Sequence, residues 1–299
     1  MISWLDRIRS GLVNRILGPR HLVTVMTALQ LLWLAVIWVT GAASNAWEIP
    51  FLLAYTVLAG ALVHFLPPHV ITWLNRQIEA LTRGRGRVIL GLTLIVAAAG
   101  IGYAGYQDVL TDEGYLMYAS RIVARQGLHG FFAVYGDVHW LGGQHPPLIP
   151  LLYGFALRLL GPALLPLRII AVVVTAGTVI LTYHLGEVWF DPRSGFLAAM
   201  LLISMPYSLR MGTAVLTDMP VTFLFLLGLV LIDRLSRRSS YVVAGAAGVV
   251  IGLRVLSKYT MLLIYPVLSC YFAARKGIRR AWPHLAVAAT VSVAVLGAW

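Results

Sequence analysis

Residues 88–115 read VILGLTLIVAAAGIGYAGYQDVLTDEGY, an apolar run that ends in a polar stretch with two adjacent acids, Asp112 and Glu113. The apolar part, 88–106, has close to the ~20 residues that a helix needs to cross about 30 Å of hydrocarbon. It shows no alternation of polar and apolar residues, so it does not fit a strand of a membrane β-barrel. The stretch therefore predicts a membrane-spanning helix followed by an acidic group at the membrane boundary.

The composition of the whole chain is that of an integral membrane protein. Of its 299 residues, 60% are hydrophobic and 11% are charged, with a mean hydropathy of +0.84, whereas a soluble domain carries about 25% charged residues. The net charge of +12 comes from basic residues in short loops between apolar runs, where they set topology and contact anionic lipid. We therefore expect the bilayer, and not nucleic acid, as the partner of this charge. The single Cys270 excludes a disulfide framework within the chain.

Apolar segments of spanning length recur along the chain. They lie at 21–40, 49–66, 88–106, 164–188, 195–213, 218–232, 241–257, 259–274 and 282–299, with a shorter one at 147–160. We predict an all-α polytopic membrane protein. It has an N-terminal pair of extra helices with a cytoplasmic loop, 1–87, and a transmembrane core, 88–299, that carries an outer loop, 107–146.

The distribution of Arg and Lys predicts the orientation. These residues collect in the N-terminal tail and in 67–87, 233–240 and 275–281, which the positive-inside rule places in the cytoplasm. If all ten segments crossed, the 233–240 cluster would lie outside. We expect 147–160 not to cross, because it follows two prolines and is only about 21 Å long as a helix. A wrong boundary within 164–213 is the alternative.

Two interpretations of Asp112 and Glu113 stay open from the residues alone. Residues 114–126 place apolar side chains at helical spacing against Arg and Gln, which predicts an amphipathic helix along the membrane surface. The acids either cap this helix or form a catalytic pair. Asp218, which the predicted topology places on the same side, favours the interpretation as a catalytic pair. An acid between two apolar runs needs a partner or a water-filled cavity unless it is itself a cap.

Basic side chains outside the cytoplasmic loops are candidates for binding an anion. Arg254 and Lys258 are four residues apart, so they share one face of a helix near its predicted outer end. They either pair with an acid or a phosphate, or extend to the headgroup level. Arg168 shares both interpretations. His145, which precedes Pro146-Pro147, is a further candidate partner for a phosphate or an acid.

The histidines do not have the spacing of a metal motif. His129, His139 and His145, with Asp137 among them, include no pair one helical turn apart. We assign no metal, and a divalent ion remains the alternative. No Gly-rich loop lies between a strand and a helix, so no nucleotide cofactor is implied.

Five short motifs follow one another in a fixed order. They are Asp112-Glu113 after a helix, Arg125-Gln126-Gly127, His145-Pro146-Pro147-Leu148, Leu160-Gly161 followed by Arg168, and Thr217-Asp218-Met219-Pro220. This order and spacing, over about residues 88–275, resemble the protein O-mannosyltransferase-like glycosyltransferases, a group that includes the aminoarabinose transferases acting on lipid A. No single one of the motifs is specific.

The resemblance implies a C-type glycosyltransferase fold in a polytopic enzyme of the inner membrane. Such an enzyme moves a sugar from a polyprenyl-phosphate carrier to a lipid, glycan or protein hydroxyl on the extracytoplasmic side. By resemblance, Asp112 is the general base or the acceptor-orienting acid, with Glu113 beside it, and Asp218 is the second acid. Lys258 matches the lysine of a Ser-Lys motif, and His145 the residue before a helix-opening proline.

The chemistry of an inverting transfer fits these residue types. The reaction needs a carboxylate that accepts the proton of the acceptor hydroxyl, and cations that hold the departing phosphate. Asp112 supplies the first, and Lys258 with Arg168, Arg254 or His145 supplies the second.

Two departures from the resemblance are visible. The spans at 21–40 and 49–66 precede the shared core, and the chain ends at Trp299 in an apolar run, whereas the family usually continues. We therefore expect either a last helix that ends at the outer interface or a piece of a longer protein. The rival function is a transporter or lipid flippase with Asp112, Asp218 and Lys258 in its path, and a non-catalytic membrane scaffold is a third reading.

Overall fold

The structure is a computed structural model that describes residues 54, 57, 67–137 and 146–297. The chain divides into two compact units, 1–80 and 81–299. A helix, α5 (Pro68–Thr82), forms where the sequence predicted a cytoplasmic loop. The predicted spans at 21–40 and 49–66 lie outside the described residues, apart from single helical positions at 54 and 57.

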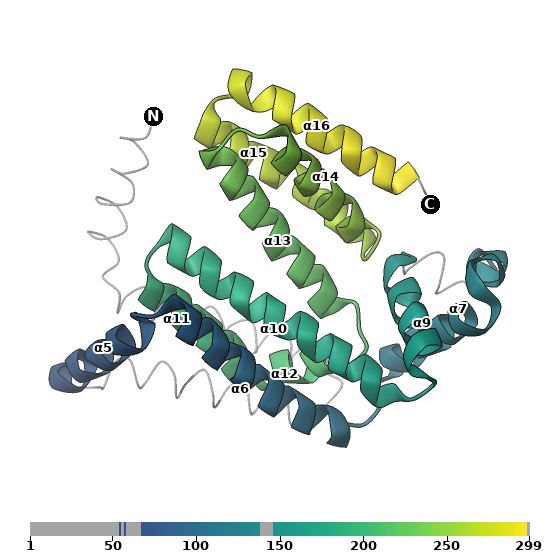
Figure 1. Cartoon of the computed structure of the whole chain (residues 1–299), viewed down its shortest axis with the longest axis horizontal. Helices are drawn as coiled ribbons and strands as arrows, with labels where there is room; N and C mark the ends of the chain where they lie inside the picture. Colours follow the sequence, from purple (N-terminus) through teal and green to yellow (C-terminus); the bar gives the residue numbers. More distant parts are fainter. Residues whose placement is uncertain (1–53, 55–56, 58–66, 138–145, 298–299) are drawn as a thin grey trace. The chain divides into compact units, whose positions relative to one another are not determined.

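The second unit consists of helices in its described part, with no strand, which confirms the all-α prediction (Figure 1). Its elements are α6 (Arg85–Tyr106), α7 (Thr111–Tyr135), α9 (Leu148–Leu160), α10 (Leu164–Trp189), α11 (Pro192–Ser204), α12 (Pro206–Thr213), α13 (Asp218–Arg237), α14 (Tyr241–Val255), the 3-10 helix η2 (Tyr259–Leu263), α15 (Ile264–Lys276) and α16 (Ile278–Gly297).

Three of the described helices, α6, α10 and α13, are long and apolar enough to cross a membrane. The single span predicted at 195–213 is instead a bent pair, α11 and α12, which turn by 74° relative to each other and count together as up to a fourth span. The break falls at Met205, since Pro206 lacks the N–H that would continue the helix. The predicted span 259–274 likewise begins as the 3-10 helix η2.

Contacts between helix ends show that α6 and α10 run antiparallel. Arg85, at the start of α6, pairs with Glu187 near the end of α10 at 3.2 Å. Arg168, near the start of α10, donates to the Ala104 carbonyl near the end of α6. We call these two ends of the unit the Arg85 end and the Glu113 end, after residues that lie there.

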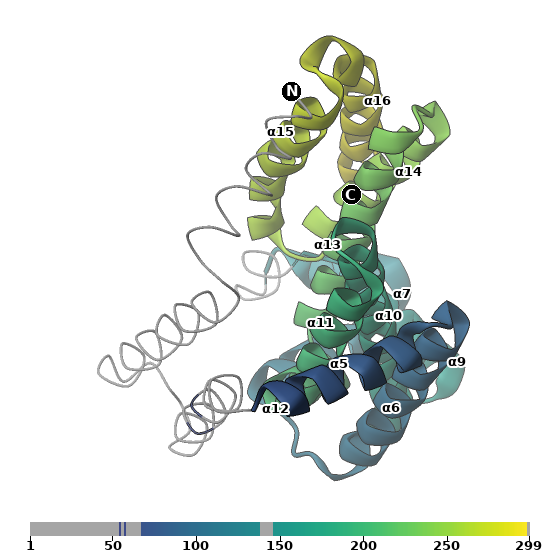
Figure 2. The same cartoon turned by 90° about the vertical axis from the view of Figure 1, so that its left-hand side faces the viewer.

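The later helices alternate between the same two ends. The ring of Trp189, the last residue of α10, lies 6.2 Å from that of Tyr271 in α15, and Tyr271 also donates to Asp233 near the end of α13. The predicted cytoplasmic clusters at 233–240 and 275–281 therefore gather at the Arg85 end. Figure 2 shows α13, α14, α15 and α16 from a second side.

The short helix α9 begins and ends at the Glu113 end. The backbone N–H of Leu148, its first residue, donates to Leu256 just beyond α14 at 3.1 Å, and three residues after Leu160 the chain starts α10. Between these points α9 packs against α7 (Figure 1). This geometry is what the expectation requires, and that 147–160 does not cross stays a prediction.

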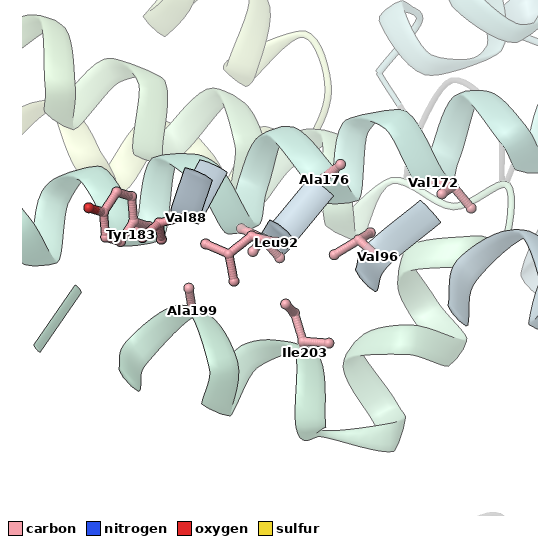
Figure 3. Packing of buried hydrophobic residues seen from close by; sticks show 9 residues of the cluster. Val88, Leu92, Val96, Val172, Ala176, Tyr183, Ala199 and Ile203 are labelled. Atoms are coloured by element: carbon pink, nitrogen blue, oxygen red, sulfur yellow. The ribbon is translucent and has the colours of Figure 1, made fainter. Parts of the chain in front are cut away.

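Buried apolar residues hold the helices together in separate clusters. One cluster joins α6, α10 and α11 through Val88, Leu92, Val96, Val172 and Ile203, among others (Figure 3). Between helices that cross a membrane, such packing stabilises through van der Waals contact, because lipid tails are as apolar as the side chains. Another cluster joins α13, α14, α15 and α16.

Two glycines bring α14 close to α16. A Cβ at Gly248 would meet the Ala288 carbonyl, and one at Gly252 would lie 2.8 Å from the Val295 Cβ. Small residues at such crossings let helix backbones approach within a membrane. Gly245, on the same helix, has open space around it.

We predict that Gly248→Ala destabilises the protein and that Gly245→Ala does not. The first change forces a methyl group against a backbone carbonyl, at a cost of about 1–3 kcal/mol. The second should be neutral or stabilising by up to about 1 kcal/mol, because Ala favours the helix. Thermal unfolding of the two purified variants in detergent checks this; equal unfolding temperatures would contradict the close packing of α14 on α16.

We also predict that Asp137→Cys and Pro162→Cys react with an impermeant thiol reagent from the same side of the membrane, and Arg238→Cys from the other. The background is Cys270→Ser, because Cys270 is exposed. Residues 137 and 162 flank α9, whose two ends meet the same end of the unit, whereas Arg238 follows α13. Labelling of 137 and 162 from opposite sides would mean that α9 crosses.

Candidate functional site

Asp112 and Glu113 both lie in the first turn of α7, but their surroundings differ. The Asp112 side chain is exposed, and it makes no hydrogen bond or ion pair with the described residues. Glu113 is fully buried, with an exposed fraction of 0%. The two acids that the sequence presented as a pair therefore have different roles open to them.

Glu113 forms a two-pronged ion pair with Arg168 of α10. Nη2 of Arg168 lies 2.7 Å from Oε2, and Nε lies 3.0 Å from Oε1. The same carboxylate accepts the backbone N–H of Val215 at 2.8 Å and that of Leu110 at 3.4 Å. Four hydrogen bonds match the acceptor capacity of a carboxylate.

The guanidinium of Arg168 is saturated in the same way. Besides Glu113, it donates to the backbone carbonyls of Ala104 and Gln107, both at 2.8 Å, and of Asp108 at 3.2 Å. These contacts use all five N–H groups of the side chain. Arg168, which is 3% exposed, therefore has no donor left for a phosphate unless one of these bonds breaks.

Asp218 and Lys258 form a second ion pair at the start of α13. Nζ of Lys258 lies 3.4 Å from Oδ1 of Asp218, and the side chains are 44% and 53% exposed, respectively. The sequence placed both residues on the outer side, and the structure brings them together. Because water screens such an exposed pair, it stabilises the fold by at most about 1 kcal/mol, so both groups can exchange partners at little cost.

The two acidic positions are connected through the buried pair. Glu113 holds the N–H of Val215, three residues before Asp218. Ala214, Val215 and Leu216 pack against Leu116 and Met117 of α7 in one buried cluster. Asp112 and Asp218 therefore lie at the same end of the unit. Asp112 precedes Glu113 in α7, and Asp218 follows the segment whose Val215 N–H donates to the Glu113 carboxylate.

The far half of α7 reaches toward the same region. Gly127 has φ +69°, a left-handed conformation that interrupts the helix and turns its second half. The hydroxyl of Tyr135, at the end of α7, lies 3.2 Å from that of Tyr259, next to Lys258. Burial, together with this hydrogen bond, raises the pKa of Tyr135 above its usual value, so the hydroxyl stays neutral at physiological pH.

Arg254 lies one helical turn before Lys258 and is 2% exposed. Its guanidinium carbon lies 4.5 Å from the centre of the Phe225 ring, and its Nη2 lies 3.2 Å from the sulfur of Met261. Its Nε and Nη1 have no hydrogen-bond partner within the described part of the chain. The cation thus has only weak partners.

The remaining candidates are not brought together. His129 and Asp137 are exposed, and His139 and His145 lie outside the described residues. No group of three side chains suited to hold a metal occurs between 67 and 137 or between 146 and 297. The metal alternative and the role of His145 therefore stay predictions.

The sequence interpretation treated Arg168 as an anion-binding candidate and did not pair it with Glu113. A usable signal existed, because an acid and an arginine at the ends of apolar runs each need a partner. What could not be read was the partner, since the two residues are 55 positions apart. The hydrogen bonds made by the backbone groups of Val215 and Ala104 could not be predicted either, because they do not depend on the side chains of these residues.

Comparison with known proteins gives a family. The family model described as dolichyl-phosphate-mannose-protein mannosyltransferase matches residues 144–299, a range that contains Asp218, Arg254 and Lys258. No curated protein and no solved structure matches the chain.

We predict that Glu113→Gln and Arg168→Met each destabilise the protein strongly. Removing one partner leaves the other charge buried and unpaired, at a cost of about 3–5 kcal/mol. The Glu113→Gln/Arg168→Met double variant should lose less than the sum of the two single losses, because the pair is coupled. Arg158→Met, an exposed arginine of α9, is the control. Unfolding curves in detergent test this, and additive losses would contradict the coupling.

Proposed function

Because the chain belongs to the dolichyl-phosphate-mannose-protein mannosyltransferase family of membrane glycosyltransferases, we propose that it transfers a sugar from a polyprenyl-phosphate carrier. The acceptor is a hydroxyl of a lipid, a glycan or a protein, and transfer takes place on the extracytoplasmic side of the inner membrane. The observation that carries the proposal is the common location of a free carboxylate, Asp112, and an exchangeable ion pair, Asp218–Lys258, at one end of the helical unit.

Asp112 is the general base in this proposal. Its carboxylate is exposed and has no partner among the described residues, so it is free to accept a proton. The acceptor oxygen attacks the anomeric carbon while the bond from that carbon to the phosphate oxygen breaks. The electron pair leaves with the phosphate and the hydroxyl proton moves to Asp112, which inverts the anomeric centre and releases the polyprenyl phosphate.

Lys258 holds the departing phosphate. In the structure its ammonium group contacts Asp218 at 3.4 Å, and a phosphate of the donor can take the place of that carboxylate. The charge of Lys258 then offsets the charge that develops on the leaving group. Release from Lys258 leaves Asp218 available to bind a sugar hydroxyl or the acceptor.

Glu113 and Arg168 act as positioning residues. Both side chains are saturated with hydrogen bonds to each other and to the backbone, so neither offers a free group to a substrate. Their role in the proposal is to hold the start of α7, with Asp112, next to the segment that leads to Asp218. His145 remains a predicted phosphate contact outside the described residues.

The alternative function is a transporter or a lipid flippase that uses Asp112, Asp218 and Lys258 as its path. One bent pair, α11 and α12, occurs among the described helices, and broken helices are a feature of some transporters. Transport proteins of that type pair such elements in two repeats, and one bent pair occurs in the described part of the chain. Together with the family match, this favours sugar transfer over transport.

We predict that Asp112→Asn lowers sugar transfer by about 100- to 10,000-fold, the usual contribution of a general base, without loss of folded protein. Asp218→Asn and Lys258→Gln should mainly weaken the use of the donor. Asp191→Asn is the matched control, because Asp191 caps α11 at the opposite end and Asn retains the cap. The assay measures radiolabelled sugar passed from membrane lipid to acceptor fractions. Unchanged transfer by Asp112→Asn at normal protein level would overturn the assignment.

A further inference from the structure

Lys258 lies at the junction of α14 and η2, in residues 256–259, which we call the Lys258 turn. Leu256 and Ser257, in the first half of this turn, are buried. In the second half, the Lys258 side chain is 44% exposed and Tyr259 is 45% exposed. The position of the Lys258 ammonium group therefore depends on the contacts that the exposed half makes with other helices.

Contacts from α9, α13 and α7 hold the Lys258 turn. They are the backbone hydrogen bond Leu148–Leu256 at 3.1 Å, the ion pair Asp218–Lys258 at 3.4 Å and the hydroxyl pair Tyr135–Tyr259 at 3.2 Å. The first contact holds the buried half of the turn, and the other two hold the exposed half. The hydroxyl pair connects the turn to the end of α7, the helix whose first turn carries Asp112.

The far half of α7 is anchored by apolar packing. Gly127 turns this half away from the first half. Phe131, which is fully buried, then packs with Val123 of the first half and with Leu151 of α9. The ring centres of Phe131 and Tyr135 lie 5.3 Å apart. The Tyr135 hydroxyl is therefore carried by a packed segment of the helix, which can hold what it binds.

The two ends of α7 contact the two segments that carry the Asp218–Lys258 ion pair. At its start, Glu113 accepts the backbone N–H of the residue three positions before Asp218. At its end, Tyr135 contacts the residue that follows Lys258. The first contact is buried and belongs to a saturated ion pair, whereas the second is a single hydrogen bond between exposed hydroxyl groups. α7 therefore has a strong connection to the segment of the acid and a weak one to the segment of the lysine.

We propose that Tyr135 is a positioning residue, which holds the Lys258 turn in place through its hydrogen bond to Tyr259. The inference rests on the proposed function and deepens it, because it assigns the far half of α7 to the same site as Asp112. Tyr135 acts through Tyr259 and the turn, and not by contact with the sugar. One helix then positions both the base and the cation of the reaction.

The hydroxyl pair matters most when Lys258 exchanges its partner. While Lys258 binds Asp218, the exposed half of the turn is also held from α13. When a phosphate replaces Asp218, that contact is lost, and the hydroxyl pair still holds this half next to α7. Without the pair, the turn is displaced for part of the time, and a less populated binding state raises the apparent Kd in proportion. Loss of one hydrogen bond between hydroxyl groups corresponds to about a 2- to 10-fold change.

Hydrogen–deuterium exchange of the purified full-length protein in detergent tests the positioning without a substrate. Tyr135→Phe keeps the ring and its packing and removes the hydroxyl. Backbone amides of residues 256–263 should exchange about 2- to 10-fold faster in this variant, because exchange follows local opening. Amides of α6 and α10 should be unchanged. Tyr103→Phe, which changes an exposed tyrosine of α6, is the matched control and should exchange like wild type.

Transfer kinetics test the consequence for the reaction, with the purified protein titrated with the radiolabelled membrane lipid of the transfer assay. Tyr135→Phe should raise the KM for this donor by about 2- to 10-fold and leave kcat nearly unchanged, because a bound phosphate itself fixes Lys258. A variant that only loses stability would lower the amount of active protein at an unchanged KM. Tyr259→Phe should match Tyr135→Phe, and the double variant should be no worse than either, because both changes remove the same hydrogen bond.

Three results would overturn the inference and leave the proposed function standing. They are unchanged exchange of residues 256–263 in Tyr135→Phe, faster exchange with an unchanged donor KM, and KM effects of Tyr135→Phe and Tyr259→Phe that multiply in the double variant. Failure of the proposed function gives a different result. Wild-type protein would then transfer no sugar, while Tyr135→Phe would still speed the exchange of residues 256–263, so that the support of the Lys258 turn by Tyr135 would stand without the reaction.

Discussion

The buried ion pair between Glu113 and Arg168 is the interaction on which the rest of the site depends. Taking two charges out of water costs several kcal/mol for each ion, and the pair is tolerated because its donors and acceptors are all satisfied. The contacts join the last turn of α6, the first turn of α7, the first turn of α10 and the segment before α13. One carboxylate thus brings together four places where the chain leaves or enters a helix.

The pair also explains why two adjacent acids have different environments. Position 113 of α7 faces inward, toward Arg168 and Val215, and position 112 faces outward. Successive residues of a helix point about 100° apart, so a buried acid can hold its neighbour at the surface. The exposed acid then has a fixed position, and no hydrogen bond or ion pair with the described residues occupies its oxygens, as the proposed role of a general base requires.

Three basic residues at the Glu113 end differ in how deeply their charges are buried and in how many hydrogen-bond partners they have. Arg168 has five oxygen partners, Lys258 shares one exposed carboxylate, and Arg254 has no oxygen partner among the described residues. All N–H groups of Arg168 are therefore used in contacts within the protein. The other two differ in exposure, since the Lys258 side chain is 44% exposed and Arg254 is 2% exposed.

The sequence by itself determined the all-α architecture and the places of most helices, and it predicts that 147–160 does not cross, because apolar length and charge placement depend on neighbouring residues alone. It also indicated Asp218 and Lys258. Only the tertiary structure decided that Glu113 and Arg168 are partners, that 195–213 is bent at Met205 and that Arg254 has no oxygen partner among the described residues. These facts depend on distances between helices far apart in the chain, and a residue's type does not specify which distant group satisfies it.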